Sequence, residues 1–134
     1  MGWPIRNPST IYALRCTENG KVYIGRTYRM EQRIKEHFDD LRRGQKTCCD
    51  FEKGSRVKSS MQVDYDTFGK DSFEVYILEE MVSPEMCKER EAHWIAEYNA
   101  TCPEYGYNKF NEKTDYVVTK HGLPPNRYKQ SEGG

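Results

Sequence analysis

Residues 10–25 read TIYALRCTENGKVYIG and give the clearest structural signal in the chain. Short alternating runs stand on either side of Asn19 and Gly20, and an Asn-Gly pair between such runs is a strong signal for a β-hairpin. We therefore expect one strand over residues 10–16 and a return strand over residues 21–25.

The two tyrosines of this stretch fall on one side of the sheet in either register of the hairpin. A two-residue loop pairs Cys16 with Tyr23, and a four-residue loop pairs Leu14 with Tyr23. Directly opposed residues share a face and side chains alternate along a strand, so Tyr12 and Tyr23 point the same way in both cases. The pair is either an aromatic part of the core or part of a site, and composition alone favours the core.

Composition limits the class of protein. The 134 residues suit a single domain, of which 31% are charged and 36% hydrophobic. The sequence shows no secretory signal and no apolar run near the roughly 20 residues of a membrane span. The five cysteines are an odd number without a Cys-x-x-Cys pair, which favours reduced thiols. We expect a cytoplasmic protein with no membrane partner. A formal net charge of 0 argues against nucleic-acid binding by global charge and leaves a local patch open.

The rest of the chain predicts helices and one more strand. Apolar residues recur at spacings of three and four over residues 30–43, and Gly44 would end that helix. The order β-β-α-α-β-α predicts an α/β (α+β) fold with a small three-stranded, mainly antiparallel sheet flanked by helices. The later segments are expected to be a polar loop over 44–56, a helix over 57–68, a strand over 73–78, a helix over 84–99 and a loop or short edge segment over 103–108.

The last residues differ in composition from the rest. Residues 111–134 contain turn residues and few apolar ones, which is typical of a partly disordered tail. We therefore expect one domain over residues 1–110 and a C-terminal tail over 111–134.

Two further placements of polar residues need an explanation. Arg33 and His37 are four apart and share a helix face, which is either a site or an ordinary solvated face. Glu91 lies in the apolar stripe of the last helix, four residues after Cys87 and three before Trp94. A carboxylate entering a core is costly unless a metal ion or a buried arginine satisfies it. The alternative is a position at the margin of the stripe that reaches water.

These placements together resemble the GIY-YIG nuclease domain. The motif reads TIY at residues 10–12 and YIG at residues 23–25, with Thr10 in place of the family's first glycine. The resemblance covers residues 9–110. The polar positions of the family are matched in order by Tyr12, Tyr23, Arg33, His37, Glu91 and Asn108.

The resemblance implies a metal-dependent DNA endonuclease that hydrolyses phosphodiester bonds, from a mobile element, phage or restriction system. It implies Mg²⁺ (or Mn²⁺) as cofactor, held by Glu91 and water, and DNA as partner. Family members often carry a separate DNA-recognition domain, so a separate recognition domain or subunit is expected. The alternatives are a structure-specific or single-strand DNA repair nuclease and a non-catalytic nucleic-acid-binding module.

The resemblance also implies roles for the other residues. Arg33 would contact the scissile phosphate and favour its transition state. Tyr12, assisted by His37, would take the proton of the attacking water, and Tyr23 would position water or phosphate; the reversed tyrosine roles are the close alternative. Asn108 would form a hydrogen bond near the site and hold its geometry.

Positive charge gathers between residues 42 and 58, where six Lys and Arg residues stand against two acidic ones. A basic loop beside the first helix would follow the phosphate backbone of DNA, and the alternative is an ordinary solvated loop. The candidate DNA contacts are Arg26, Arg42, Arg43, Lys46, Arg56 and Lys58.

Overall fold

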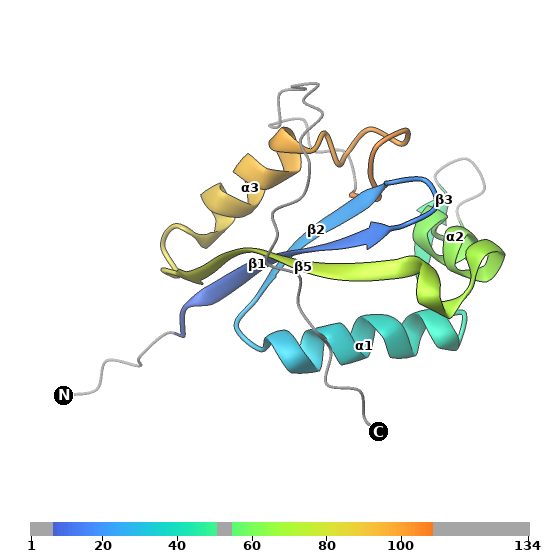
Figure 1. Ribbon diagram of the computed structural model, residues 1–134, viewed down its shortest axis with the longest axis horizontal. Coiled ribbons are helices and arrows are strands. Elements are labelled where there is room, and N and C mark those ends of the chain that lie inside the picture. Colours follow the sequence, from blue (N-terminus) through green and yellow to red (C-terminus); the bar gives the residue numbers. More distant parts are fainter. Residues whose placement is uncertain (1–6, 51–54, 109–134) are drawn as a thin grey trace.

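The sheet has three strands in the order β2-β1-β5, and both pairings are antiparallel. The computed structural model describes residues 7–50 and 55–108. Helices α1 and α3 cover opposite faces of the sheet, and α2 lies beyond the end where β1 turns into β2 (Figure 1). The main elements are β1 (Ser9–Cys16), β2 (Val22–Thr27), α1 (Met30–Arg42), α2 (Ser60–Phe68), β5 (Phe73–Val82) and α3 (Cys87–Glu97). The fold class expected from the sequence is confirmed.

The hairpin adopts the four-residue register. Leu14 lies opposite Tyr23, and Tyr12 lies opposite Gly25. Gly20 closes the loop with φ +76°, a left-handed conformation that glycine adopts without a steric penalty. The rings of Tyr12 and Tyr23 lie on the same face with centroids 6.3 Å apart, as the period of two predicts.

Strand β1 is buried on both faces, so its alternate residues belong to two hydrophobic clusters. One face packs against α1 and α2 through Tyr12, Leu14, Cys16, Ile34, Phe38, Leu41 and Met61. The other packs towards α3 and the segment after it through Ile11, Ala13, Val22, Ile24, Trp94, Ile95 and Ala100. The two phenols therefore face α1, and α3 lies across the sheet from them.

The prediction of a polar loop over residues 44–56 is wrong, because strands in this segment form a second small sheet. Strands β3 (Thr47–Asp50) and β4 (Ser55–Lys58) pair antiparallel. Its polar sequence gives no apolar alternation to detect.

The boundaries of three elements also differ from the sequence prediction. Helix α3 begins at Cys87 rather than at residue 84, because residues 84–86 form a turn. Helix α2 begins at Ser60 rather than at residue 57, because the Ser59 side chain accepts a hydrogen bond from the Gln62 amide and caps the helix there. Strand β5 continues past residue 78 to Val82, because its pairing with β1 extends to Ser9 beyond an irregularity in the register.

The segment after α3 returns to the sheet. Gly106 forms a parallel bridge with Val22 at the β2 edge, so part of the expected 103–108 segment is an edge contact. The predicted C-terminal tail over 111–134 lies outside the described residues. Among residues 7–50 and 55–108, no helix has the length and apolar character needed to cross a membrane.

Candidate active site

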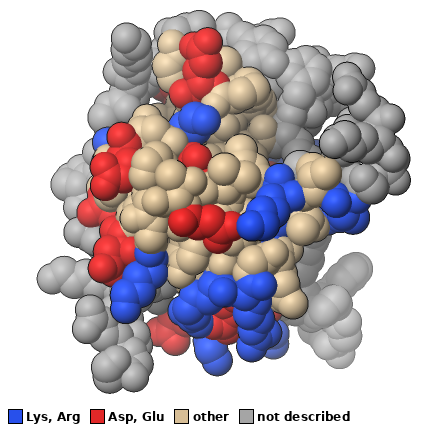
Figure 2. Space-filling model, turned by 90° about the vertical axis from the view of Figure 1, so that its right-hand side faces the viewer, with Lys and Arg blue, Asp and Glu red and all other residues tan. Residues whose placement is uncertain are grey.

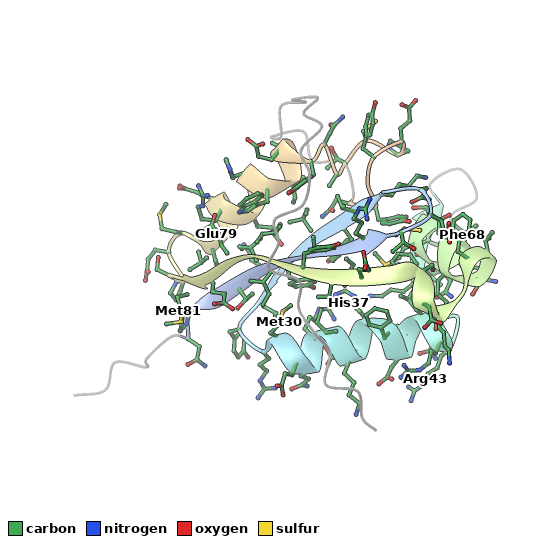
Figure 3. The ribbon with its side chains drawn as sticks, viewed as in Figure 1. Met30, His37, Arg43, Phe68, Glu79 and Met81 are labelled. Carbon is green, nitrogen blue, oxygen red and sulfur yellow. The ribbon has the colours of Figure 1, made fainter. Side chains whose placement is uncertain are left out.

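The centre of the candidate site is a contact between β1 and α1. The Tyr12 hydroxyl oxygen lies 2.6 Å from His37 Nε2, and each residue is only 1% exposed. His37 shares the inward face of α1 with Ile34 and Phe38, so it points to the sheet, as Figure 3 shows. The half-buried Tyr23 ring lies edge-on to the imidazole at a centroid distance of 5.4 Å. Two phenols and one imidazole therefore form a single cluster.

Gly25 makes room for the buried phenol. A Cβ atom at this position would lie 2.5 Å from the Tyr12 hydroxyl oxygen and 2.6 Å from the ring carbon that carries it. A tyrosine ring is rigid, so a side chain at residue 25 would displace it. The position of the last glycine in the YIG motif therefore requires a residue without a side chain, which the sequence alone did not show.

Arg33 lies one helical turn before His37 and supplies positive charge to the cluster. Burial raises the pKa of Tyr12 and of Tyr23, and the Arg33 guanidinium opposes this by charge and by hydrogen bonding. Its side chain is 38% exposed and its Nη1 lies 3.4 Å from the Glu36 carboxylate. Both phenols are neutral at pH 7, beside a guanidinium that is accessible to an anion.

Glu91 approaches from α3, on the other side of the sheet. Its half-buried carboxylate lies 3.8 Å from Arg26 Nη1, on the edge strand β2. Burial raises the pKa of Glu91, and Arg26 lowers it. Among smaller effects, the Glu91 charge also raises the pKa of Tyr12 and Tyr23, so the acid lies within electrostatic range of both phenols.

The donors at this position suit a magnesium-type ion. Among residues 7–50 and 55–108, no group of three or more His, Cys, Asp or Glu side chains could hold a metal ion. Glu91 offers one carboxylate, which is still 24% exposed. Mg²⁺ prefers oxygen ligands, keeps several waters and commonly uses one or two carboxylates plus substrate phosphates. The residues present fit Mg²⁺ or Mn²⁺ and do not form a structural zinc site.

Asn108 supports the site through the backbone. Its Oδ1 accepts a hydrogen bond from the Ile24 amide at 2.8 Å, and its Nδ2 donates to the Ile24 carbonyl at 2.9 Å. Ile24 stands between Tyr23 and Gly25, so Asn108 fixes the part of β2 that carries both residues. The role of Asn108 in catalysis, which the resemblance implied, stays a prediction.

Lys46 points inward, towards His37. Its Nζ lies 2.7 Å from His37 Nδ1 and 3.9 Å from the Asp40 carboxylate. The Lys46 amide donates to Gln62 Oε1 at 3.1 Å, and the Gln62 side chain also donates to the Leu41 carbonyl. Sequence reasoning missed the fully buried Gln62, because a lone glutamine in a short helix carries no signal of burial.

The other candidate DNA contacts lie apart from this cluster. Figure 2 shows Lys and Arg side chains gathered on the lower part of the face that α2 and the end of α1 reach. Arg42 and Arg43 are exposed at the end of α1, where Arg42 pairs with Asp39. Arg56 donates to the Thr47 side chain and carbonyl, Lys58 pairs with Asp66, and Arg26 pairs with Glu91.

Comparison with protein families gives a match over residues 8–108 to the GIY-YIG catalytic domain. The chain belongs to the GIY-YIG family. A curated relative, intron-associated endonuclease 1 of Enterobacteria phage T4, is 37% identical over 101 residues, which are 75% of this chain and 36% of that protein. The chain therefore spans about a third of the length of that relative.

Solved structures of the same kind share the fold of this GIY-YIG domain. The catalytic domain of the homing endonuclease I-TevI matches with a TM-score of 0.59 at 35% identity, over 77% of this chain and 99% of that chain. A substituted form of the same domain matches with a TM-score of 0.59 at 34% identity, over 75% of this chain and 92% of that chain.

Proposed function

We propose that this GIY-YIG domain is a metal-dependent DNA endonuclease that hydrolyses phosphodiester bonds, of the kind found in mobile elements, phages or restriction systems. The observation that carries the proposal is the convergence of two phenols from the β1–β2 hairpin with the Arg33 guanidinium, within the field of the Glu91 carboxylate. The T4 relative, named as an endonuclease, supports this chemistry.

Arg33 is suited to hold the scissile phosphate. A guanidinium forms charge-assisted, often bidentate hydrogen bonds with phosphate oxygens, and these strengthen as charge develops in the transition state. Arg33 is reachable from solvent and lies beside both phenols, so a phosphate bound to it would stand next to the groups that handle the proton.

A phenol oxygen serves as the general base in this proposal. The ionised phenol accepts a proton from the attacking water while the water oxygen bonds to phosphorus and the bond from phosphorus to the leaving oxygen breaks. Burial raises the pKa of both tyrosines, so ionisation needs positive charge beyond that of Arg33. Mg²⁺ (or Mn²⁺) bound at Glu91 would supply that charge and stabilise charge developing on the phosphate oxygens. Burial raises the pKa of Glu91, and the Arg26 charge opposes this and favours the ionised form that a metal ligand requires.

Two observations bear on which tyrosine is the base. The Tyr12 oxygen lies 2.6 Å from His37 Nε2, whereas Tyr23 meets His37 ring to ring; a donor at an oxygen favours its ionised form, which supports Tyr12. Tyr23 is half-buried whereas Tyr12 is closed to solvent, which supports the reversed roles because less movement would bring water to Tyr23. We retain Tyr12 as the base and Tyr23 as the group that positions water or phosphate.

DNA contact is assigned to the exposed cations near the end of α1. Arg42 and Arg43 are exposed there, and Arg56 and Lys58 would contribute from β4. Phosphate contacts of this kind position DNA without reading its sequence. The proposal therefore includes sequence recognition by a separate domain or subunit.

The test is an incubation of the purified chain with single-stranded, duplex and branched DNA, with and without Mg²⁺. Cleavage that depends on Mg²⁺ supports the endonuclease proposal. Preference for single strands or branched DNA would favour the repair-nuclease alternative. Binding without cleavage of any substrate would instead indicate a non-catalytic nucleic-acid-binding module.

A further inference from the structure

His37 is held at both ring nitrogens, by groups from two different segments. Its Nε2 lies 2.6 Å from the Tyr12 hydroxyl oxygen, and its Nδ1 lies 2.7 Å from Lys46 Nζ. The imidazole therefore bridges a tyrosine of β1 and the lysine that follows the turn after α1. No role in catalysis was expected of Lys46 from the sequence, which placed it among the DNA contacts.

The proton positions follow from the inventory of donors and acceptors. A lysine ammonium has only donors, so His37 Nδ1 must accept from it. Burial and the Arg33 charge lower the pKa of Lys46, and the carboxylates of Asp40, 3.9 Å from Nζ, and Glu36 oppose this and favour the ammonium form. Burial, together with the charges of Lys46 and Arg33, lowers the pKa of His37 to about 3, so the ring is neutral and carries one proton. That proton is left on Nε2, where it is donated to the Tyr12 oxygen.

We propose that Lys46 is a positioning residue that fixes the Nε2–H tautomer of His37, so that His37 donates to the Tyr12 oxygen and never accepts the Tyr12 proton. This deepens the proposed function and rests on it for its catalytic consequence. With His37 as the donor, the Tyr12 hydroxyl hydrogen is directed away from α1, and the ionised phenol keeps a hydrogen bond. With the opposite tautomer, Tyr12 would donate to His37, and ionisation would remove that bond.

The direct test is ¹⁵N NMR of the His37 ring in the full chain near pH 7, because a protonated and an unprotonated ring nitrogen have well-separated shifts. We expect Nε2 to be protonated and Nδ1 unprotonated in the parent and in Lys46→Arg, which keeps the donors. We expect Lys46→Met to lose this preference. Lys35→Met removes an exposed lysine from α1 and should leave the His37 signals unchanged.

This measurement needs no DNA and no metal, so it is independent of the nuclease proposal. A proton on Nδ1 of the parent protein would overturn the inference. An unchanged tautomer in Lys46→Met would also overturn it.

Cleavage kinetics provide the second readout. General-base catalysis contributes about 10²–10⁴-fold in all, so we expect Lys46→Met to lower kcat roughly tenfold to hundredfold with KM little changed, and Lys46→Arg to recover most of it. A rise in KM with kcat unchanged would show that Lys46 binds DNA instead. Absence of cleavage in the parent would refute the proposed function and leave the NMR result standing.

Discussion

Gly25 and Tyr12 face each other across the β1–β2 ladder, and a Cβ atom at Gly25 would lie 2.5 Å from the Tyr12 hydroxyl oxygen. We predict that Gly25→Ala moves the Tyr12 ring and separates it from His37. Overpacking of this kind costs about 1–3 kcal/mol of folding stability. Cleavage should fall further than the stability loss explains, because the folded fraction at 25 °C stays high while the phenol is misplaced. Urea unfolding and DNA cleavage at the same temperature measure the two effects. Full activity in Gly25→Ala would show that the position of Tyr12 is not critical.

The two tyrosines are distinguished by removal of one oxygen at a time. We predict that Tyr12→Phe binds DNA like the parent and cuts it poorly, because binding uses the cations and cleavage needs the phenol oxygen. It should also lose about 1–3 kcal/mol of stability, since His37 Nε2 is left without its buried partner. Tyr23→Phe is the matched variant, in a half-buried position. If Tyr12→Phe cuts normally and Tyr23→Phe does not, the general base is Tyr23.

Replacement of Asn108 tests whether its side chain stabilises strand β2. Asn108→Ala leaves the Ile24 amide and carbonyl without the hydrogen bonds that the side chain provides. We predict a stability loss of about 2 kcal/mol and a lower rate of cleavage with DNA affinity maintained. Hydrogen exchange at the Ile24 amide should accelerate while amides within the β1–β5 pairing stay protected. Unchanged exchange at Ile24 would contradict this role.

The buried imidazole predicts how stability depends on pH. Burial holds the pKa of His37 at about 3, against 6.5 for the free side chain. Between these values the unfolded chain binds a proton that the folded chain does not, so this contribution is complete above pH 6.5 and is lost as the pH falls towards 3. Tyr12, Tyr23, Arg33 and Lys46 surround the ring, and none of them offers a negative charge near neutral pH to reverse the sign.

His37→Gln provides the comparison for that pH dependence, because an amide does not titrate. One group contributes at most about 1.4 kcal/mol per pH unit to the slope of the unfolding free energy. We predict that the parent shows a steeper fall of this energy between pH 6 and 4 than His37→Gln does, measured by urea unfolding. Parallel curves would mean that His37 is protonated in the folded protein.

The sequence predicted those features that depend on local periodicity. Tyr12 and Tyr23 share a face in either hairpin register, because a shift of two residues in the loop preserves the alternation. The spacing of four residues correctly placed His37 on the same face of α1 as Arg33. Glu91 was expected to need a cation or to reach water, and the structure shows both Arg26 beside it and partial exposure.

Features that depend on long-range packing could not be predicted. The direction in which the Lys46 side chain points depends on the turn after α1 and on the buried Gln62, which is 16 residues away in the chain. The β3–β4 pair has a polar sequence in which ladder formation leaves no apolar pattern. The contact of Gly25 with Tyr12 requires knowledge of the register and of the ring orientation together.

The central claim is that Glu91 and the phenol cluster form one metal-dependent nuclease site. The most direct measurement is the rate of DNA cleavage with Mg²⁺ by the parent, by Glu91→Ala and by Glu89→Ala, which removes an acid from the first turn of the same helix. We predict that Glu91→Ala loses at least about a hundredfold in rate, on the order of 3 kcal/mol of barrier, while Glu89→Ala cuts like the parent. Equal cleavage by Glu91→Ala and the parent would contradict it.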